Sequence, residues 1–103
     1  VSVYNIALND GMEDYIYYSG GETFYLRFCP ISDGEYTLRF SDLSALFHVE
    51  LLDSDFGYIT SQESNSIELT YYMNMGETYY YAVTPPIANA SEHFFWPRVT
   101  RSA

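Results

Sequence analysis

The sequence offers few residues that could perform covalent chemistry. Its only histidines are His48 and His93, and its only cysteine is Cys29. Enzymes need a nucleophile with a base, paired acids in a cleft, or a metal cluster. No GxSxG, HExxH or glycine-rich phosphate loop is present, and no Cys/His spacing suggests zinc. Two carboxylates can hydrolyse a glycoside, but 103 residues leave little room for a deep cleft. We therefore expect a protein without catalytic activity, in which Cys29 is a small buried thiol.

Tyrosine supplies the residues most suited to binding. The chain has twelve, and rings on a flat sheet face pack against sugar CH groups or apolar protein side chains. Strand phase, set out below, turns Tyr25, Tyr72 and Tyr80 outward. The alternative is that these rings form cross-strand pairs that stabilise an exposed sheet by ~0.2 to 1 kcal/mol each. Further candidates for the binding site are Arg27, Arg39 and Trp96, with His48 and Glu50 nearby.

Trp96 is the only tryptophan and lies within Phe94-Phe95-Trp96-Pro97. Three adjacent aromatics cannot all point to one side of a strand. Either one of them is exposed for binding, or the segment packs over the end of the domain and the proline marks an edge.

Clustered acids raise the possibility of calcium. Asp10, Glu13 and Asp14 crowd one expected loop, and Asp53 with Asp55 crowd another. Carboxylate oxygens are the ligands that calcium prefers, but neither cluster has the EF-hand spacing. Acidic hairpins are more often plain turns. The sequence therefore predicts no cofactor, or calcium at Asp10, Glu13 and Asp14.

The charge balance narrows the choice of partner. Fourteen acidic residues face four basic ones, all arginine, so the formal charge is −10. Nucleic acid and anionic membranes are disfavoured, whereas cations, neutral glycans and basic protein surfaces remain open. No apolar run approaches the ~20 residues that a membrane-spanning helix needs. We expect no membrane insertion.

Hydrophobic alternation in short bursts predicts an all-β chain. Gly, Asp, Asn, Ser and Pro separate the bursts, and only 41 to 45 suggests a helical turn. Such spacing indicates a single antiparallel β-sandwich or small barrel over residues 1–103. Because the chain opens on Val1, we expect it to be part of a longer extracellular protein with covalently linked neighbouring domains. The expected strands are 3–8, 14–18, 23–29, 35–41, 46–53, 57–62, 66–73, 78–84 and 93–100.

Strand phase assigns side chains to faces. Phe24, Leu26, Phe28, Tyr36, Leu38, Phe40, Val49, Leu51, Ile67, Leu69, Tyr71, Met73, Tyr79, Tyr81 and Val83 are expected to point inward. Thr37, His48, Glu50, Leu52 and Ala82 are expected on the solvent side, and the tyrosines of 71–81 are expected to brace a last hairpin.

Three quoted stretches resemble a known family. Phe24 to Phe28 followed by "CPISDGEYTLRFS", then "VELLDSDFGYITS" and "LTYYMNMGETYYYAVTP", look like bacterial pre-peptidase C-terminal domains and their jelly-roll relatives. The likeness covers roughly residues 13 to 85, with a departure at Phe56-Gly57 in the hairpin. It implies a jelly-roll-like β-sandwich, secreted or at the cell surface, serving as a non-catalytic accessory domain that binds polysaccharide or matrix protein. A structural spacer within a multidomain surface protein is the alternative.

Overall fold

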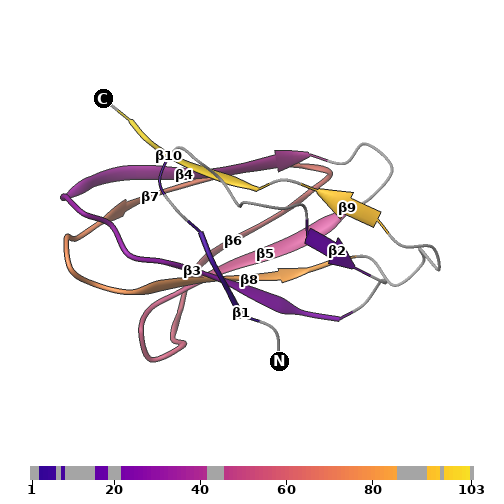
Figure 1. The fold of residues 1–103 in the computed structure, drawn as a ribbon, viewed down its shortest axis with the longest axis horizontal. Helices are drawn as coiled ribbons and strands as arrows, with labels where there is room; N and C mark the ends of the chain where they lie inside the picture. Colours follow the sequence, from indigo (N-terminus) through magenta and orange to yellow (C-terminus); the bar gives the residue numbers. More distant parts are fainter. Residues whose placement is uncertain are drawn as a thin grey trace.

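The computed structural model describes residues 3–6, 8, 16–18, 22–41, 46–85, 93–95 and 97–102. For 16–18, 41 and 93–95 it describes the backbone alone. Two sheets face each other across a shared core, so the predicted β-sandwich is confirmed (Figure 1). The strands are β1 (Val3–Asn5), β2 (Ile16–Tyr18), β3 (Phe24–Phe28), β4 (Gly34–Ser41), β5 (Phe47–Leu52), β6 (Tyr58–Ser64), β7 (Ser66–Met73), β8 (Tyr79–Thr84), β9 (His93–Phe95) and β10 (Arg98–Arg101).

One layer has five strands in the order β1-β3-β8-β5-β6, and the other has three in the order β10-β4-β7. Strands β2 and β9 form a separate antiparallel pair. Not every pairing is antiparallel, because β1 runs parallel to β3 and Leu8 forms a parallel bridge to Val99 of β10. The segment after β1 therefore passes from one sheet to the other along one side of the sandwich.

The tyrosine-rich stretch does not form the expected hairpin. Strand β7 pairs with β4 in one sheet, and β8 pairs with β3 and β5 in the other. The turn between β7 and β8, in which residues 74–77 are exposed, therefore connects one sheet to the other. Both strands have an apolar face that must be buried. Strands in two facing sheets bury these faces as well as two paired strands of one sheet do. By contrast, β5 and β6 do pair through the acidic loop 53–57.

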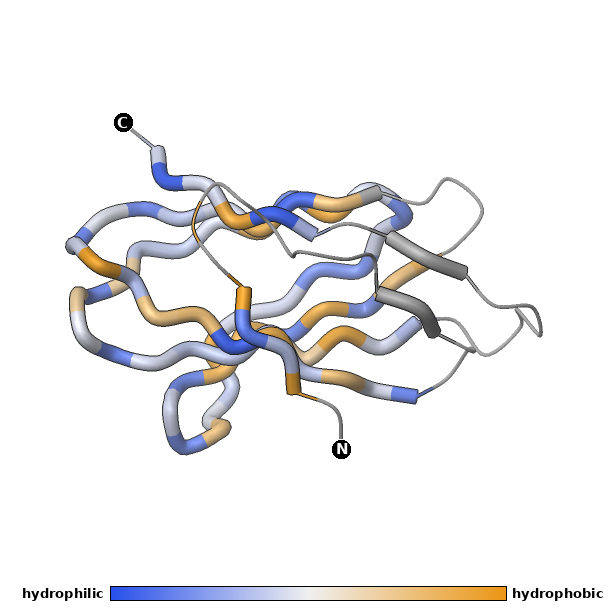
Figure 2. The backbone as a smooth tube through the Cα atoms, viewed as in Figure 1, coloured by the Kyte–Doolittle hydropathy of each residue, from blue (hydrophilic) through white to orange (hydrophobic). Residues whose placement is uncertain are grey.

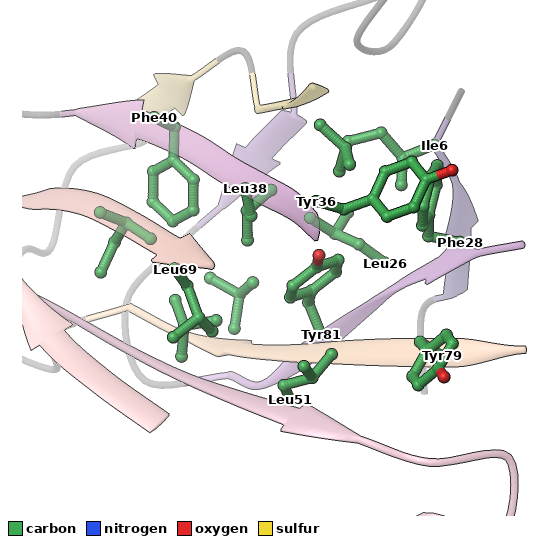
Figure 3. Packing of buried hydrophobic residues seen from close by; sticks show 14 of the residues in the cluster. Ile6, Leu26, Phe28, Tyr36, Leu38, Phe40, Leu51, Leu69, Tyr79 and Tyr81 are labelled. Carbon is green, nitrogen blue, oxygen red and sulfur yellow. The ribbon is translucent and has the colours of Figure 1, made fainter. Parts of the chain in front are cut away.

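Alternation of hydrophobic and hydrophilic residues runs along most described strands (Figure 2). It places one side chain of every two in the core, where the cluster draws on both sheets (Figure 3). Leu26, Leu38, Val49, Leu51, Tyr36 and Tyr81 are completely inaccessible to solvent. Among the described residues, no helix has the length and hydropathy that a membrane span requires.

Three buried tyrosines differ in how their hydroxyls are satisfied. The Tyr36 hydroxyl donates to the Ser32 carbonyl oxygen at 2.7 Å, and the Tyr79 hydroxyl accepts from the Asn74 amide at 3.1 Å. The Tyr81 hydroxyl is buried with no hydrogen-bond partner among the described residues. Tyr81 rises from β8 into the middle of the core (Figure 3). Burial raises the pKa of Tyr81 strongly.

Two expectations about faces are wrong. Tyr71 was expected inside but is 37% exposed. It lies near the end of β7, the last described strand of its sheet, and packs edge-on against Tyr79 while its other side stays open. Thr37 was expected outside but is 2% exposed, because it lies in the central strand of the three, with its hydroxyl 2.8 Å from that of Thr70.

Cys29 also differs from its expected burial. Its thiol is exposed and lies 3.4 Å from the Thr78 hydroxyl. The neighbouring Pro30 is buried. The alternation of strand β3 continues for two residues past Phe28, so Cys29 points away from the core and Pro30 points toward it.

Candidate functional site

The outer face of the five-stranded sheet brings two predicted binding residues together. Tyr25 of β3 and Tyr80 of β8 both alternate with buried neighbours and therefore point away from the core. The antiparallel register sets Tyr25 opposite Ala82 and Arg27 opposite Tyr80. Tyr25 and Tyr80 are thus diagonal neighbours on adjacent strands, within reach of a common contact.

That contact comes from the hairpin between β5 and β6. Its loop is closed by the Asp53 amide donating to the Gly57 carbonyl at 2.9 Å and by the Phe56 amide donating to the Asp53 carbonyl at 3.0 Å. The Asp53 Oδ1 atom accepts from the Asp55 and Gly57 amides at 2.9 and 2.8 Å. One carboxylate therefore organises the loop, as aspartate commonly does in turns. In Figure 1 this loop (pink, lower left) leaves the sheet and projects away from it.

Phe56 folds from the loop onto the two tyrosines. Its ring stacks on Tyr80 with centroids 4.4 Å apart and meets Tyr25 edge-on at 5.7 Å. Half of Phe56 remains accessible, at 52%. Its φ is +62°, a left-handed conformation that is uncommon for any residue other than glycine and an outlier for a bulky one. We call Tyr25, Phe56 and Tyr80 the aromatic platform.

The platform explains two further departures from the expected faces. Leu52 and Ala82 point outward by strand phase, yet each is only 7% exposed. Neither belongs to the main core cluster. The register places Leu52 beside Tyr80 and Ala82 beside Tyr25, so the rings above them exclude water. The outer face thus carries its own small apolar cluster.

Polar and acidic groups surround the platform. Arg27 donates from Nε to the Asn5 amide oxygen at 2.7 Å, and its side chain is exposed. His48 lies 3.2 Å from a Glu50 carboxylate oxygen and 3.8 Å from one of Glu63. These groups lie on an open sheet face, each with about half of its side chain accessible. Tyr58 adds an exposed ring at the start of β6, with its hydroxyl 2.9 Å from that of Ser61.

Two predicted site residues lie elsewhere. Tyr72 is 54% exposed, on the outer face of the three-stranded sheet. Arg39 lies on that same face, bonded to Thr100 at 2.8 Å and 3.5 Å from Glu68. An open hollow of about 240 Å³ is lined there by Arg39, Phe40, Ser66, Ile67 and Glu68. The structure therefore separates the predicted site into two groups on opposite sides of the sandwich.

Other predicted residues cannot be placed. Trp96, Asp10, Glu13 and Asp14 lie outside the described residues. Calcium at the three acids therefore remains a prediction. In the second acidic loop the Asp53 oxygen is already bonded to backbone amides, and the described part of the chain groups no three His, Cys, Asp or Glu residues as a metal site.

Strand addition is a second way for a sandwich to bind, through an open sheet edge. Strand β7 ends its sheet, but side chains of β6 occupy part of its edge. The Glu68 amide donates to the Gln62 amide oxygen at 2.7 Å, and the Ser66 amide donates to the Ser64 hydroxyl at 3.0 Å. These bonds remove pairing positions at this edge. The aromatic platform is therefore the better candidate.

Sequence reasoning missed Phe56, the central ring of the platform. The sequence did contain one indication of Phe56, because Phe56-Gly57 departs from the family pattern in the hairpin. An aromatic residue inside an acidic hairpin loop has no place in the two-residue periodicity of either flanking strand. Only the loop geometry shows that the ring turns back onto the sheet.

Solved structures provide a comparison for the fold. No family model matches the chain, and no curated protein sequence matches it. The pre-peptidase C-terminal domain of a collagenase from Bacillus anthracis is similar, with a TM-score of 0.63 and 16% identity over 95% of this chain and 94% of that one. PliG of Aeromonas hydrophila, a periplasmic inhibitor of g-type lysozyme, is similar with a TM-score of 0.65 and 9% identity over 98% of both chains. The resemblance inferred from sequence is therefore confirmed as a shared fold, that of a bacterial pre-peptidase C-terminal domain.

Proposed function

We propose that this chain is a non-catalytic binding module of an extracellular or cell-surface bacterial protein, and that it binds polysaccharide or an extracellular protein through the aromatic platform. The observation that carries the proposal is Phe56, a half-exposed ring held in a left-handed backbone conformation. Strain of this kind persists where the surrounding structure imposes it, and it is concentrated at ligand-binding positions.

The surroundings of the described histidine agree with a non-catalytic role. His48 lies on an open face with two carboxylates, and the hollow at Arg39 lies on the opposite sheet. General acid and base groups act on a substrate held within hydrogen-bond reach, usually in a concave site. The residues that line the hollow at Arg39 do not include His48.

A structural spacer is the second candidate, and one observation favours it. Leu52 and Ala82 are buried beneath the platform, so Phe56 also acts as a cover for a small apolar cluster. On this alternative the hairpin stabilises the sheet and binds nothing. The arrangement of the parent gene separates the two: tandem copies favour the spacer, and an adjacent protease or glycosidase favours binding.

Retention assays test the proposed function directly. The isolated domain would be applied to a glycan array and to immobilised collagen, beside the Phe56→Gly variant. We expect retention on at least one surface, and its loss in the variant. A wild-type domain retained on neither would contradict binding, and equal retention of both proteins would remove the platform as its site.

A further inference from the structure

We propose that the platform and its acidic rim bind a cationic segment of a protein, with Lys or Arg side chains lying across Phe56 and reaching the carboxylates beside it. This inference rests on the proposed function and narrows its ligand to one class.

Charge on the outer face is the first step. The described rim carries four carboxylates, those of Glu50, Asp53, Asp55 and Glu63, against the single guanidinium of Arg27. Two of these carboxylates lie close to His48, with its ring nitrogens 3.2 Å from a Glu50 oxygen and 3.8 Å from a Glu63 oxygen. The formal charge of the whole chain, these groups included, is −10. Such a field attracts cationic partners, whereas neutral ligands gain nothing from it.

The shape of the platform is the second step. Phe56 stacks on Tyr80, so the ring face offered to a ligand belongs mainly to Phe56. Tyr58 and Val3 are the other exposed apolar groups on this sheet, at 62% and 46%. Lys and Arg carry a long apolar stem that packs on such surfaces while the charged head stays in water. The head also gains from a cation–π contact within about 6 Å of a ring centroid.

An alternative ligand, a neutral glycan, fits this geometry less well. A sugar chain that lies along a sheet would gain most contact from several flat ring faces side by side. Here Phe56 covers one face of Tyr80 and meets Tyr25 through an edge. The acidic rim can accept hydrogen bonds from a sugar, but water offers the same hydrogen bonds. Its electric field exerts no net attraction on a neutral ligand.

The experiment uses an oligolysine peptide as the probe. Binding to the intact chain would be followed by titration calorimetry and amide NMR shifts at an ionic strength of about 0.15 M, where remote surface charges are screened beyond ~8 Å. An oligoglutamate of equal length and a neutral cello-oligosaccharide serve as comparison ligands. We expect oligolysine alone to bind, with shifts centred on Tyr25, Phe56 and Tyr80.

Variants separate specific recognition from general attraction to an acidic protein. Phe56→Gly should weaken oligolysine binding about tenfold, since it removes the cation–π and stem contacts. Asp55→Asn should weaken it about threefold. Glu35→Gln makes the same change of charge on the opposite sheet, where Glu35 is exposed opposite Tyr72, and should leave the affinity unchanged.

Two results would overturn this inference. One is the absence of oligolysine binding, and the other is equal weakening in Asp55→Asn and Glu35→Gln, which would show attraction to net charge alone. The proposed function would survive either result if a glycan or collagen surface retained the wild type and lost the Phe56→Gly variant. It would fail as well if no surface retained the wild type.

Discussion

At the scale of single residues, the glycine of the 53–57 loop is Gly57, whereas the positive φ that favours glycine occurs at Phe56. Glycine in turns commonly supplies a positive φ, and Gly76 does so at +84°. In the 53–57 loop, however, Phe56 has the positive φ. A Cβ at Gly57 would lie 2.7 Å from an Asp53 carboxylate oxygen, so close approach fixes that glycine. Phe56 is left with the unfavourable conformation.

This arrangement predicts an inverted order of stability for two variants. Phe56→Ala loses the ring contacts, worth ~0.5 to 1.5 kcal/mol beyond area burial, and keeps a left-handed non-glycine residue. Phe56→Gly loses the same contacts but relieves about 1 kcal/mol of backbone strain. We expect the glycine variant to be the more stable of the two by about 1 kcal/mol in urea denaturation. An alanine variant equal to or more stable than glycine would show that the loop carries no strain.

Tyr81 allows a second residue-scale prediction. A buried hydroxyl without a partner destabilises by about 1 to 3 kcal/mol, so Tyr81→Phe should raise the free energy of unfolding by about 1 kcal/mol. Tyr36→Phe is the matched control, because that hydroxyl donates to Ser32 at 2.7 Å and its removal should destabilise by about 1 kcal/mol. Opposite signs in the denaturant midpoints are the expected outcome. A loss of stability in Tyr81→Phe would mean that its hydroxyl has a partner after all.

At the scale of elements, Asp53 holds the hairpin that presents Phe56. Asp53→Ala removes an acceptor for two backbone amides and should destabilise by about 1 to 2 kcal/mol. Asp53→Asn keeps one acceptor oxygen and should lie between the alanine variant and the wild type. Phe56 ring NMR shifts should move toward free values in the same order, since the ring loses its stacking as the loop loosens. Unchanged ring shifts in Asp53→Ala would show that stacking alone orders the loop.

The strands were predictable because each carries its own periodic signal. All ten strands overlap the expected ranges, although the single range 93–100 holds two strands, β9 and β10, and β6 has no buried residue. Pairing was less predictable, since the β7–β8 turn has the sequence of a hairpin turn although it connects the two sheets. A hairpin within one sheet and a connection between two sheets require the same alternation in the flanking strands. The local sequence pattern therefore does not distinguish the two.

The candidate site was predictable only in part. Phase predicted that Tyr25 and Tyr80 point outward, and the structure makes them neighbours on one sheet. Tyr72 and Arg39 share the same outward signal but belong to the opposite sheet, which phase alone cannot reveal. Phe56 lies in a loop, where no period assigns a direction. Its position depends on the contact it makes with the sheet.

At the scale of the whole molecule, the buried tyrosines set a limit on stability at high pH. Burial raises the pKa of Tyr81 and of Tyr79 above the usual value of 10.0, with the Asn74 amide opposing the shift at Tyr79. Above pH 10 the unfolded chain loses these protons while the folded chain keeps them. The unfolded state then binds fewer protons, so stability falls as pH rises.

We expect the free energy of unfolding to be insensitive to these two groups below pH 10 and to fall above it. The fall can reach about 1.4 kcal/mol per pH unit for each group that stays protonated in the folded state. Urea denaturation at several pH values between about 8 and 11.5 measures the slope, and phenolate absorbance reports whether ionisation accompanies unfolding. Tyr81→Phe should flatten the slope, because of the two described tyrosines with a raised pKa only Tyr79 would remain. A variant with the wild-type slope would show that Tyr81 ionises without unfolding, in conflict with its complete burial.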